Sequence, residues 1–194
     1  MRAVTLFVED YGHEKFIEAL IYRLGNENKV KVEIIPRSVT GGHGSVLVEF
    51  EKFQQEIFKG KEGLPDLLVV ATDANCEGYN KRRTGLKIDE RIKNFTVSAI
   101  PDPHIERWML LDSAAFKSVF GKRCNAPDQK SERDRYKRIL FNAIQDAGIT
   151  PILGGFEYAD DIVMEMDLQR AGKTDASFGK FLKDLHDKFN EWAL

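Results

Sequence analysis

The chain has 194 residues, of which 42% are hydrophobic and 31% charged, and its formal net charge is −2 at pH 7. This composition can fill the core of one domain with an extension, and so small a charge excludes binding to nucleic acid or anionic membranes by bulk electrostatics alone. Two cysteines are too few for a disulfide framework or a zinc-ligand set, and no apolar run is long enough to span a membrane, so we expect a cytoplasmic protein without a membrane segment.

The first hundred residues alternate between strand and helix patterns. Short apolar runs, typical of strands buried on both faces, and one alternating segment that stops at Pro36 predict four strands, at 3–8, 30–35, 67–71 and 95–100. Between them, apolar residues at helical spacing predict helices over 13–24 and 46–57, and a polar stretch ending at Asn94 predicts a third. This alternation indicates a mostly parallel sheet with right-handed crossovers.

The second half of the chain has a different pattern. After Pro101 no strand pattern appears, and three segments predict helices, at 103–111, 132–147 and 177–192. We therefore predict an α/β fold with a small, mostly parallel, doubly wound sheet of about four strands over residues 1–101. A helical extension over residues 102–194 is expected to pack on this core.

Acidic residues follow two strands of the predicted sheet. The first strand runs into Glu9 and Asp10, and the third runs into Asp73 and Asn75, with Glu77 close behind. In a doubly wound sheet these strands are usually neighbours, and ligands bind at the carboxyl ends of strands where the strand order reverses. Oxygen ligands from rigid strand ends suit Mg²⁺ or Mn²⁺, whereas capping of the next helix would explain the same residues without a metal.

The residues at these strand ends resemble those of a known family. Glu9 after the first strand and residues 72–75 after the third resemble the Toprim domain of topoisomerases, primases and OLD-family nucleases, which has a Glu and then an Asp-x-Asp at these points. The chain is also similar to small stand-alone Toprim-like proteins of prokaryotic defence systems. Their fourth strand leads into a Pro…Glu-x-Trp helix, a pattern present in residues 101–108. The resemblance covers about residues 1–112.

The resemblance implies a function and roles for individual residues. It implies an Mg²⁺- or Mn²⁺-dependent protein acting on phosphodiester or phosphoryl groups, a nuclease or nuclease-related component of a defence or DNA-processing system. Glu9 would be a metal ligand or general acid/base, and Asp73 and Asn75 would be metal ligands. Nucleic acid is an implied partner, and so is an ATPase, because the chain has no nucleotide motif. Replacing Glu9 or Asp73 with Ala is then expected to abolish metal binding and leave folding intact.

One position departs from the family pattern. Asn75 stands where the family has its second Asp, which lowers the negative charge of the site. Glu77 is a candidate ligand that would compensate, and Asp10 and Glu106 are additional candidates. The departure also leaves open a non-catalytic Toprim relic that acts as a binding module. A receiver-like domain phosphorylated on Asp73 is another alternative, although the Lys after a fifth strand that receivers require has no counterpart here.

Other residues suggest phosphate contacts or have structural explanations. Lys81, Arg82 and Arg83 follow the acidic loop and would form a basic rim for a nucleic-acid backbone. His43 lies in a Gly-rich helix entry where it could contact phosphate. Asp102 before Pro103 is typical of a helix start with Asp102 as N-cap, which places Glu106 one turn into the helix. We expect Trp108 to pack in the core.

Overall fold

The computed structural model of the chain describes residues 1–38, 43–124, 128–130, 132 and 134–193. Within them lies a sheet of four parallel strands in the order β2-β1-β3-β4. The strands are β1 (Arg2–Val8), β2 (Val32–Ser38), β3 (Leu67–Ala71) and β4 (Thr96–Ala99). The predicted parallel α/β fold and the adjacency of the first and third strands are therefore confirmed.

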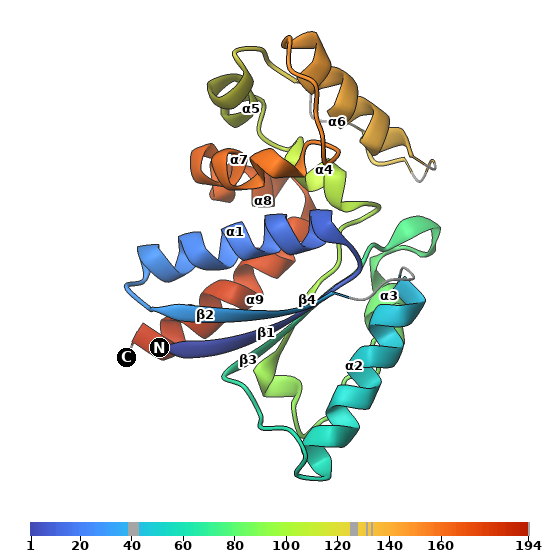
Figure 1. Cartoon of the computed structure of the whole chain (residues 1–194), viewed down its shortest axis with the longest axis vertical. Helices are drawn as coiled ribbons and strands as arrows, with labels where there is room; N and C mark the ends of the chain where they lie inside the picture. The colour runs from blue at the N-terminus through green and yellow to red at the C-terminus, as the bar shows by residue number, and fades with distance from the viewer. Residues whose placement is uncertain (39–42, 125–127, 131, 133, 194) are drawn as a thin grey trace.

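Helices cover both faces of the sheet (Figure 1). One face carries α1 (Tyr11–Glu27) and α9 (Ala176–Ala193), and the other carries α2 (His43–Phe58) and α3 (Tyr79–Gly85). Successive side chains of a strand point to opposite faces, so each strand supplies both cores. In β1, for example, Leu6 belongs to the larger hydrophobic cluster with α1 and α9, and Phe7 belongs to the smaller one with α2.

The second half of the chain is helical and shares the larger core. Besides α9, its elements are α4 (Ile105–Met109), α5 (Ser113–Phe120), α6 (Arg135–Asp146), the 3₁₀ turn η3 (Phe156–Tyr158), α7 (Ala159–Glu165) and α8 (Leu168–Thr174). Trp108 of α4 is fully buried among rings that include Phe178 and Phe181 of α9, so its predicted place in the core is confirmed. No helix in the described ranges has the length and apolarity needed to cross a bilayer.

Two predicted boundaries are wrong for reasons of hydrogen bonding. β2 continues through Pro36 to Ser38 because β2 is an edge strand, where a residue without an N–H group costs no ladder bond on its open side. Asp102 does not cap α4, which begins only at Ile105. Instead, Asp102 Oδ2 accepts a hydrogen bond from the backbone N–H of Tyr79, at the start of α3 (3.3 Å).

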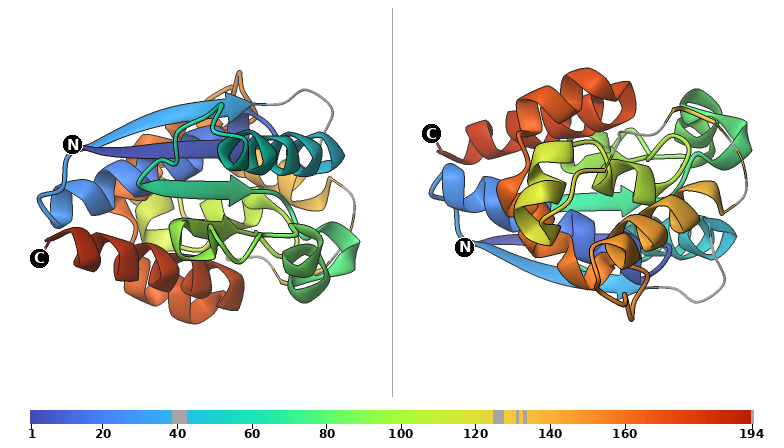
Figure 2. Two further views of the ribbon diagram at one scale, coloured as in Figure 1. Left: turned by 90° about the horizontal axis from the view of Figure 1, so that it is seen from below. Right: turned by 90° about the horizontal axis from the view of Figure 1, so that it is seen from above.

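The delayed start of α4 follows from pairing beyond the ends of β3 and β4. The carbonyls of Ala99, Pro101 and Pro103 accept hydrogen bonds from the N–H groups of Thr72, Ala74 and Asn75, at 3.1, 2.8 and 3.0 Å. This pairing carries the chain past the end of β4 and through a bend at Asp102 and Pro103, and His104, which is extended, directly precedes the helix. The strands point toward one end of the molecule, and both termini lie at the opposite end (Figure 2). The candidate site residues gather at the end to which the strands point.

Candidate functional site

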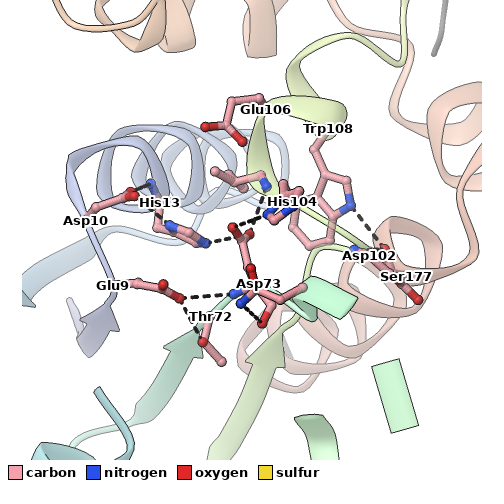
Figure 3. Close-up of polar contacts among 12 residues, drawn as sticks. Glu9, Asp10, His13, Thr72, Asp73, Asp102, His104, Glu106, Trp108 and Ser177 are labelled. Atoms are coloured by element: carbon pink, nitrogen blue, oxygen red, sulfur yellow. Dashed lines mark hydrogen bonds and ion pairs between the residues drawn. The ribbon is translucent and has the colours of Figure 1, made fainter. Parts of the chain in front are cut away.

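The ends of β1 and β3 meet through Glu9. The parallel register pairs Val8 with Ala71, so the residues that follow each strand are adjacent. Glu9 Oε2 accepts hydrogen bonds from Thr72 Oγ1 (2.9 Å) and from the backbone N–H of Asp73 (3.3 Å). Its second oxygen has no hydrogen-bond partner among the described residues. The acidic residues of the two strand ends therefore lie side by side, as Figure 3 shows.

Asp73 is the most heavily hydrogen-bonded group of the site. Its Oδ1 accepts from His13 Nε2 (3.1 Å) and from the N–H of Ile105 (2.9 Å), and its Oδ2 accepts from His104 Nδ1 (3.0 Å). The residue is only 9% exposed. Both carboxylate oxygens are thus held by protein groups (Figure 3). A receiver aspartate needs a carboxylate oxygen that is free to be phosphorylated, whereas both oxygens of Asp73 already have partners.

His13 lies between two carboxylates. Asp10 is the N-cap of α1, and its Oδ1 accepts both the N–H of His13 (3.0 Å) and the ring Nδ1–H of His13 (2.9 Å). Because the other ring nitrogen donates to Asp73, both nitrogens are donors, which requires the imidazolium form. The alternative that Asp10 caps the following helix is therefore confirmed, and Asp10 has the second task of holding a buried cation.

The pKa shifts have opposite signs within this network. Burial alone would lower the pKa of His13, but the carboxylates of Asp73 and Asp10 raise it well above its usual value. Burial alone would raise the pKa of Asp73, but His13 and His104 bring it below its usual value, and His13 does the same for Asp10. The hydrogen bond to Asp73 raises the pKa of His104. The result is a row of alternating charges, Asp10–His13–Asp73–His104.

A cavity of about 260 Å³ opens beside this row. Its lining includes Glu9, Asp10, Asp73, Asn75, His104 and Glu106, together with Lys137 of α6. Of the predicted ligands, the structure therefore brings five to one cavity.

Glu106 is the least compensated charge of this cavity. It is 4% exposed and makes no hydrogen bond to another residue in the described part of the chain; the nearest cation is Lys137 Nζ, at 3.9 Å. Burial and the charge of Asp73 raise its pKa. The ion pair of Arg107 with Asp175 and the hydrogen bond from Trp108 Nε1 to Ser177 Oγ (3.1 Å) fix α4, which carries Glu106.

Asn75 reaches the cavity through an unusual backbone conformation. Its φ is +51°, in the left-handed region, which Asn adopts more readily than most residues. Its Nδ2 donates to the carbonyl of Asp73 at 3.4 Å. The amide therefore lines the cavity beside Asp73, and its side-chain oxygen is a neutral candidate ligand where the Toprim pattern has a carboxylate.

Glu77 and the predicted basic rim do not line this cavity. The Glu77 carboxylate pairs with Lys81 Nζ at 3.3 Å and with the guanidinium of Arg82 at 3.4 Å. Arg82 is buried, and Arg83 donates to Ser98 Oγ at 2.5 Å, so of these three cations only Lys81 is largely exposed. The side chain of His43 and the Gly-rich turn before it lie outside the described part of the structure.

Two histidines and one lysine of the site are not among the residues predicted from the sequence. His13 stands three residues after an acidic N-cap that directly follows a strand, and this spacing is a readable signal, because it points the residue back toward the strand end. His104 lies at the same carboxyl end of the sheet, but it reaches Asp73 only through backbone pairing beyond β4, which has no sequence signal. Lys137 has no such signal, because it depends on the packing of α6 against α4.

The carboxylate oxygens that line the cavity are of the chemical type that binds a hard divalent cation. In the described residues, no group of three or more His, Cys, Asp or Glu is arranged so that it could hold a metal as it stands. Yet Glu9, Asp10 and Glu106 each bring a carboxylate oxygen without a hydrogen-bond partner in that part of the chain to one cavity. Carboxylate oxygens are the ligands that Mg²⁺ and Mn²⁺ take from proteins, so these side chains match such an ion in chemical type.

The site lies at the carboxyl ends of β1 and β3, where the strand order reverses, and the acidic residues that follow these strands line one cavity with Glu106 of α4. Comparison with protein-family models, with curated proteins and with solved structures found no match.

Proposed function

We propose that this chain is a Toprim-like protein that binds Mg²⁺ or Mn²⁺ and acts on phosphodiester or phosphoryl groups, as a nuclease or a nuclease-related component of a prokaryotic defence or DNA-processing system. The observation that carries the proposal is Glu106, a buried carboxylate without a hydrogen bond to another described residue, which lines one cavity with Glu9 and Asp10. A buried charge without a partner is costly unless something neutralises it. A divalent cation is the simplest neutralising group for several such carboxylates.

The proposal assigns different tasks to the acidic residues. Glu9, Asp10 and Glu106 supply the oxygens for the cation, and the amide oxygen of Asn75 is available beside them. Asp73 accepts hydrogen bonds from His13 and His104 on its two oxygens, so its task is to position these two side chains. A bound divalent cation would stabilise negative charge on a phosphoryl group and lower the pKa of a bound water.

Two cations of the chain can hold the substrate phosphate. His104 has its Nδ1 fixed on Asp73, and the residue lines the cavity, so its ring can donate a second hydrogen bond to a phosphate oxygen. Lys137 reaches the same cavity from α6. Nucleic acid remains a proposed partner. An ATPase is the other, because the sequence lacks a nucleotide motif of its own.

Metal binding is expected to depend on Glu9 and not on Glu77. Calorimetric titration of the wild type with Mn²⁺ should give a Kd of roughly 0.1–10 mM, the range for a hydrated ion held by few carboxylates. Glu9→Gln removes one charged ligand and should raise the Kd about 10-fold. Glu77→Gln is the matched control, since Glu77 pairs with Lys81 and Arg82 away from the cavity. Equal affinity in the wild type and Glu9→Gln would refute the assignment.

Hydrolysis of nucleic acid is the direct test of the proposed activity. The wild type should cut DNA or RNA with Mn²⁺ and spare it with EDTA, and Glu106→Gln should lose this activity while keeping its fold. The control is Glu90→Gln, an exposed glutamate paired with Lys93 outside the cavity. Cutting by Glu106→Gln at the wild-type rate would remove Glu106 from the site. If neither the wild type nor Asn75→Asp cuts any substrate, stand-alone nuclease activity is wrong.

A further inference from the structure

A second cavity, larger and mostly apolar, lies next to the acidic one. It measures about 540 Å³, within the range of ligand-binding pockets. Aromatic rings from three separate elements line it: Tyr11 of α1, Phe141 of α6 and Phe156 of η3. The function proposed above leaves this cavity without a role.

The walls of this apolar cavity are held in place by specific contacts. A Cβ atom on Gly12 would come within 2.7 Å of the Phe156 ring, so the glycine lets that ring pack against the first turn of α1. The carboxylate of Glu157 accepts hydrogen bonds from the N–H groups of Ile152 (2.6 Å), Leu153 (3.1 Å) and Gly155 (3.0 Å). The loop over residues 152–157, which forms one wall, is therefore held by hydrogen bonds to the carboxylate of its own Glu157, and this favours a preformed pocket.

The apolar and the acidic cavity share three residues. Asp10, Glu106 and Lys137 line both of them. The shared boundary thus carries a cation, the Lys137 ammonium, and a buried carboxylate, Glu106, whose oxygens make no hydrogen bond to another described residue. An occupant of the apolar cavity can therefore place a polar group at the acidic cavity.

We propose that the apolar cavity binds the base of a nucleotide and that Lys137 holds the attached phosphate at the acidic cavity. Flat rings such as Phe141 and Tyr11 are the surfaces on which bases stack. The amide of Asn142 supplies both a donor and an acceptor of the kind that read base edges. A purely apolar ligand would offer no hydrogen bond to this amide, which favours a base over a lipid chain.

The placement of the phosphate at the acidic cavity rests on the proposed function, whereas the binding of a base in the apolar cavity does not. The same chemistry is present in a free mononucleotide and in the terminal nucleotide of a strand. In both cases the phosphate next to the bound base would lie among Lys137, His104 and the acidic residues. The inference thus makes a nucleotide unit the substrate class of the site.

The test is calorimetric titration of the full chain with the four ribonucleoside 5′-monophosphates in the presence of EDTA. Phe141→Ala removes a ring that is 37% exposed, and Phe95→Ala, which removes a ring 40% exposed outside both cavities, is the matched control. Phe141→Ala should weaken binding about 10-fold, the scale of a lost base stack, and Phe95→Ala should bind as the wild type does. Ribose 5-phosphate, which has no base, should bind equally to all three.

The role of Lys137 in phosphate binding is tested with a second pair of variants and with a single-stranded oligonucleotide. Lys137→Ala should weaken binding of mononucleotides and leave binding of adenosine unchanged, with Lys93→Ala as the control, a lysine that also pairs with a glutamate. A 5′-phosphorylated single-stranded oligonucleotide identifies the source: Phe141-dependent binding of the strand alone supports the terminal nucleotide. Nucleotide binding that is unchanged in Phe141→Ala, or absent for every probe, overturns the inference.

The nucleotide titrations distinguish a failure of the base pocket from a failure of the proposed function. Because EDTA removes divalent cations, Phe141-dependent binding of nucleotides stands even if the protein neither binds Mn²⁺ nor cuts nucleic acid. Conversely, wild-type cutting by Phe141→Ala together with unchanged nucleotide affinity would overturn the base pocket and leave the metal site intact.

Discussion

Replacing Asp73 with alanine is expected to lower the free energy of unfolding by about 3–5 kcal/mol, the cost of removing one partner from a buried ion pair. The substitution leaves His13, which is 1% exposed, without one of its two carboxylates. It also removes the acceptor of the N–H of Ile105 and of His104 Nδ1. Urea denaturation at pH 6 measures the loss.

A matched aspartate serves as the control for this experiment. Asp66 also accepts from a cation and a backbone N–H, those of Arg2 and Ala3, but its side chain is 31% exposed. Exposed pairs of this kind contribute about 1 kcal/mol or less. If Asp73→Ala costs no more than Asp66→Ala, the buried network does not stabilise the fold as described.

The expected instability of Asp73→Ala changes how the site must be probed. From the sequence, Asp73 is expected to be a metal ligand that can be removed without harm to folding. With both carboxylate oxygens hydrogen-bonded inside the protein, a loss of metal binding in Asp73→Ala would not distinguish ligation from collapse of the site. Glu9 and Glu106 are the informative positions, because each contributes an oxygen that no described residue binds.

Most of the sheet was predictable from the sequence because three of its strands, β1, β3 and β4, are buried over most of their length. The run 67–71 is fully buried in β3, and a continuous apolar run of that length suits few other structures. The alternation of strands and helices then implied parallel pairing and the neighbouring positions of β1 and β3. Boundaries were less predictable, since β2 passes through Pro36 only because it lies at the edge.

The candidate site was predictable where it depends on strand ends and not where it depends on loops. The contact of Glu9 with Asp73 follows from parallel pairing alone. His104 reaches Asp73 because backbone hydrogen bonds continue beyond β3 and β4 to Pro103, a feature with no sequence signal. Glu77 diverges because the turn η1 (Asn75–Glu77) leads its side chain to Lys81 and Arg82.

Stability is expected to depend on pH in a direction set by His13. Its pKa is raised in the folded state, so its contribution is complete below the unfolded pKa of 6.5 and is lost as pH rises through the folded pKa. The pKa values of Asp10 and Asp73 are lowered, so their contributions are complete above the unfolded value of 3.8 and are lost as pH falls through the folded pKa. The cluster therefore stabilises the fold most between these two unfolded values.

Above pH 6.5 the folded state holds one proton at His13 that the unfolded state releases. The free energy of unfolding should then fall by up to about 1.4 kcal/mol per pH unit between pH 6.5 and the raised folded pKa of His13, a steep loss relative to the stability of a typical domain. The raised pKa values of His104 and Glu106 act on stability with the same sign, so the test is the difference between two proteins. His13→Gln lacks the titrating ring. Its free energy of unfolding, measured by urea denaturation at several pH values above 6.5, should therefore fall less steeply with pH than that of the wild type, by up to the slope that corresponds to one proton. Parallel profiles for the wild type and His13→Gln would show that His13 is not held as a buried imidazolium between Asp10 and Asp73.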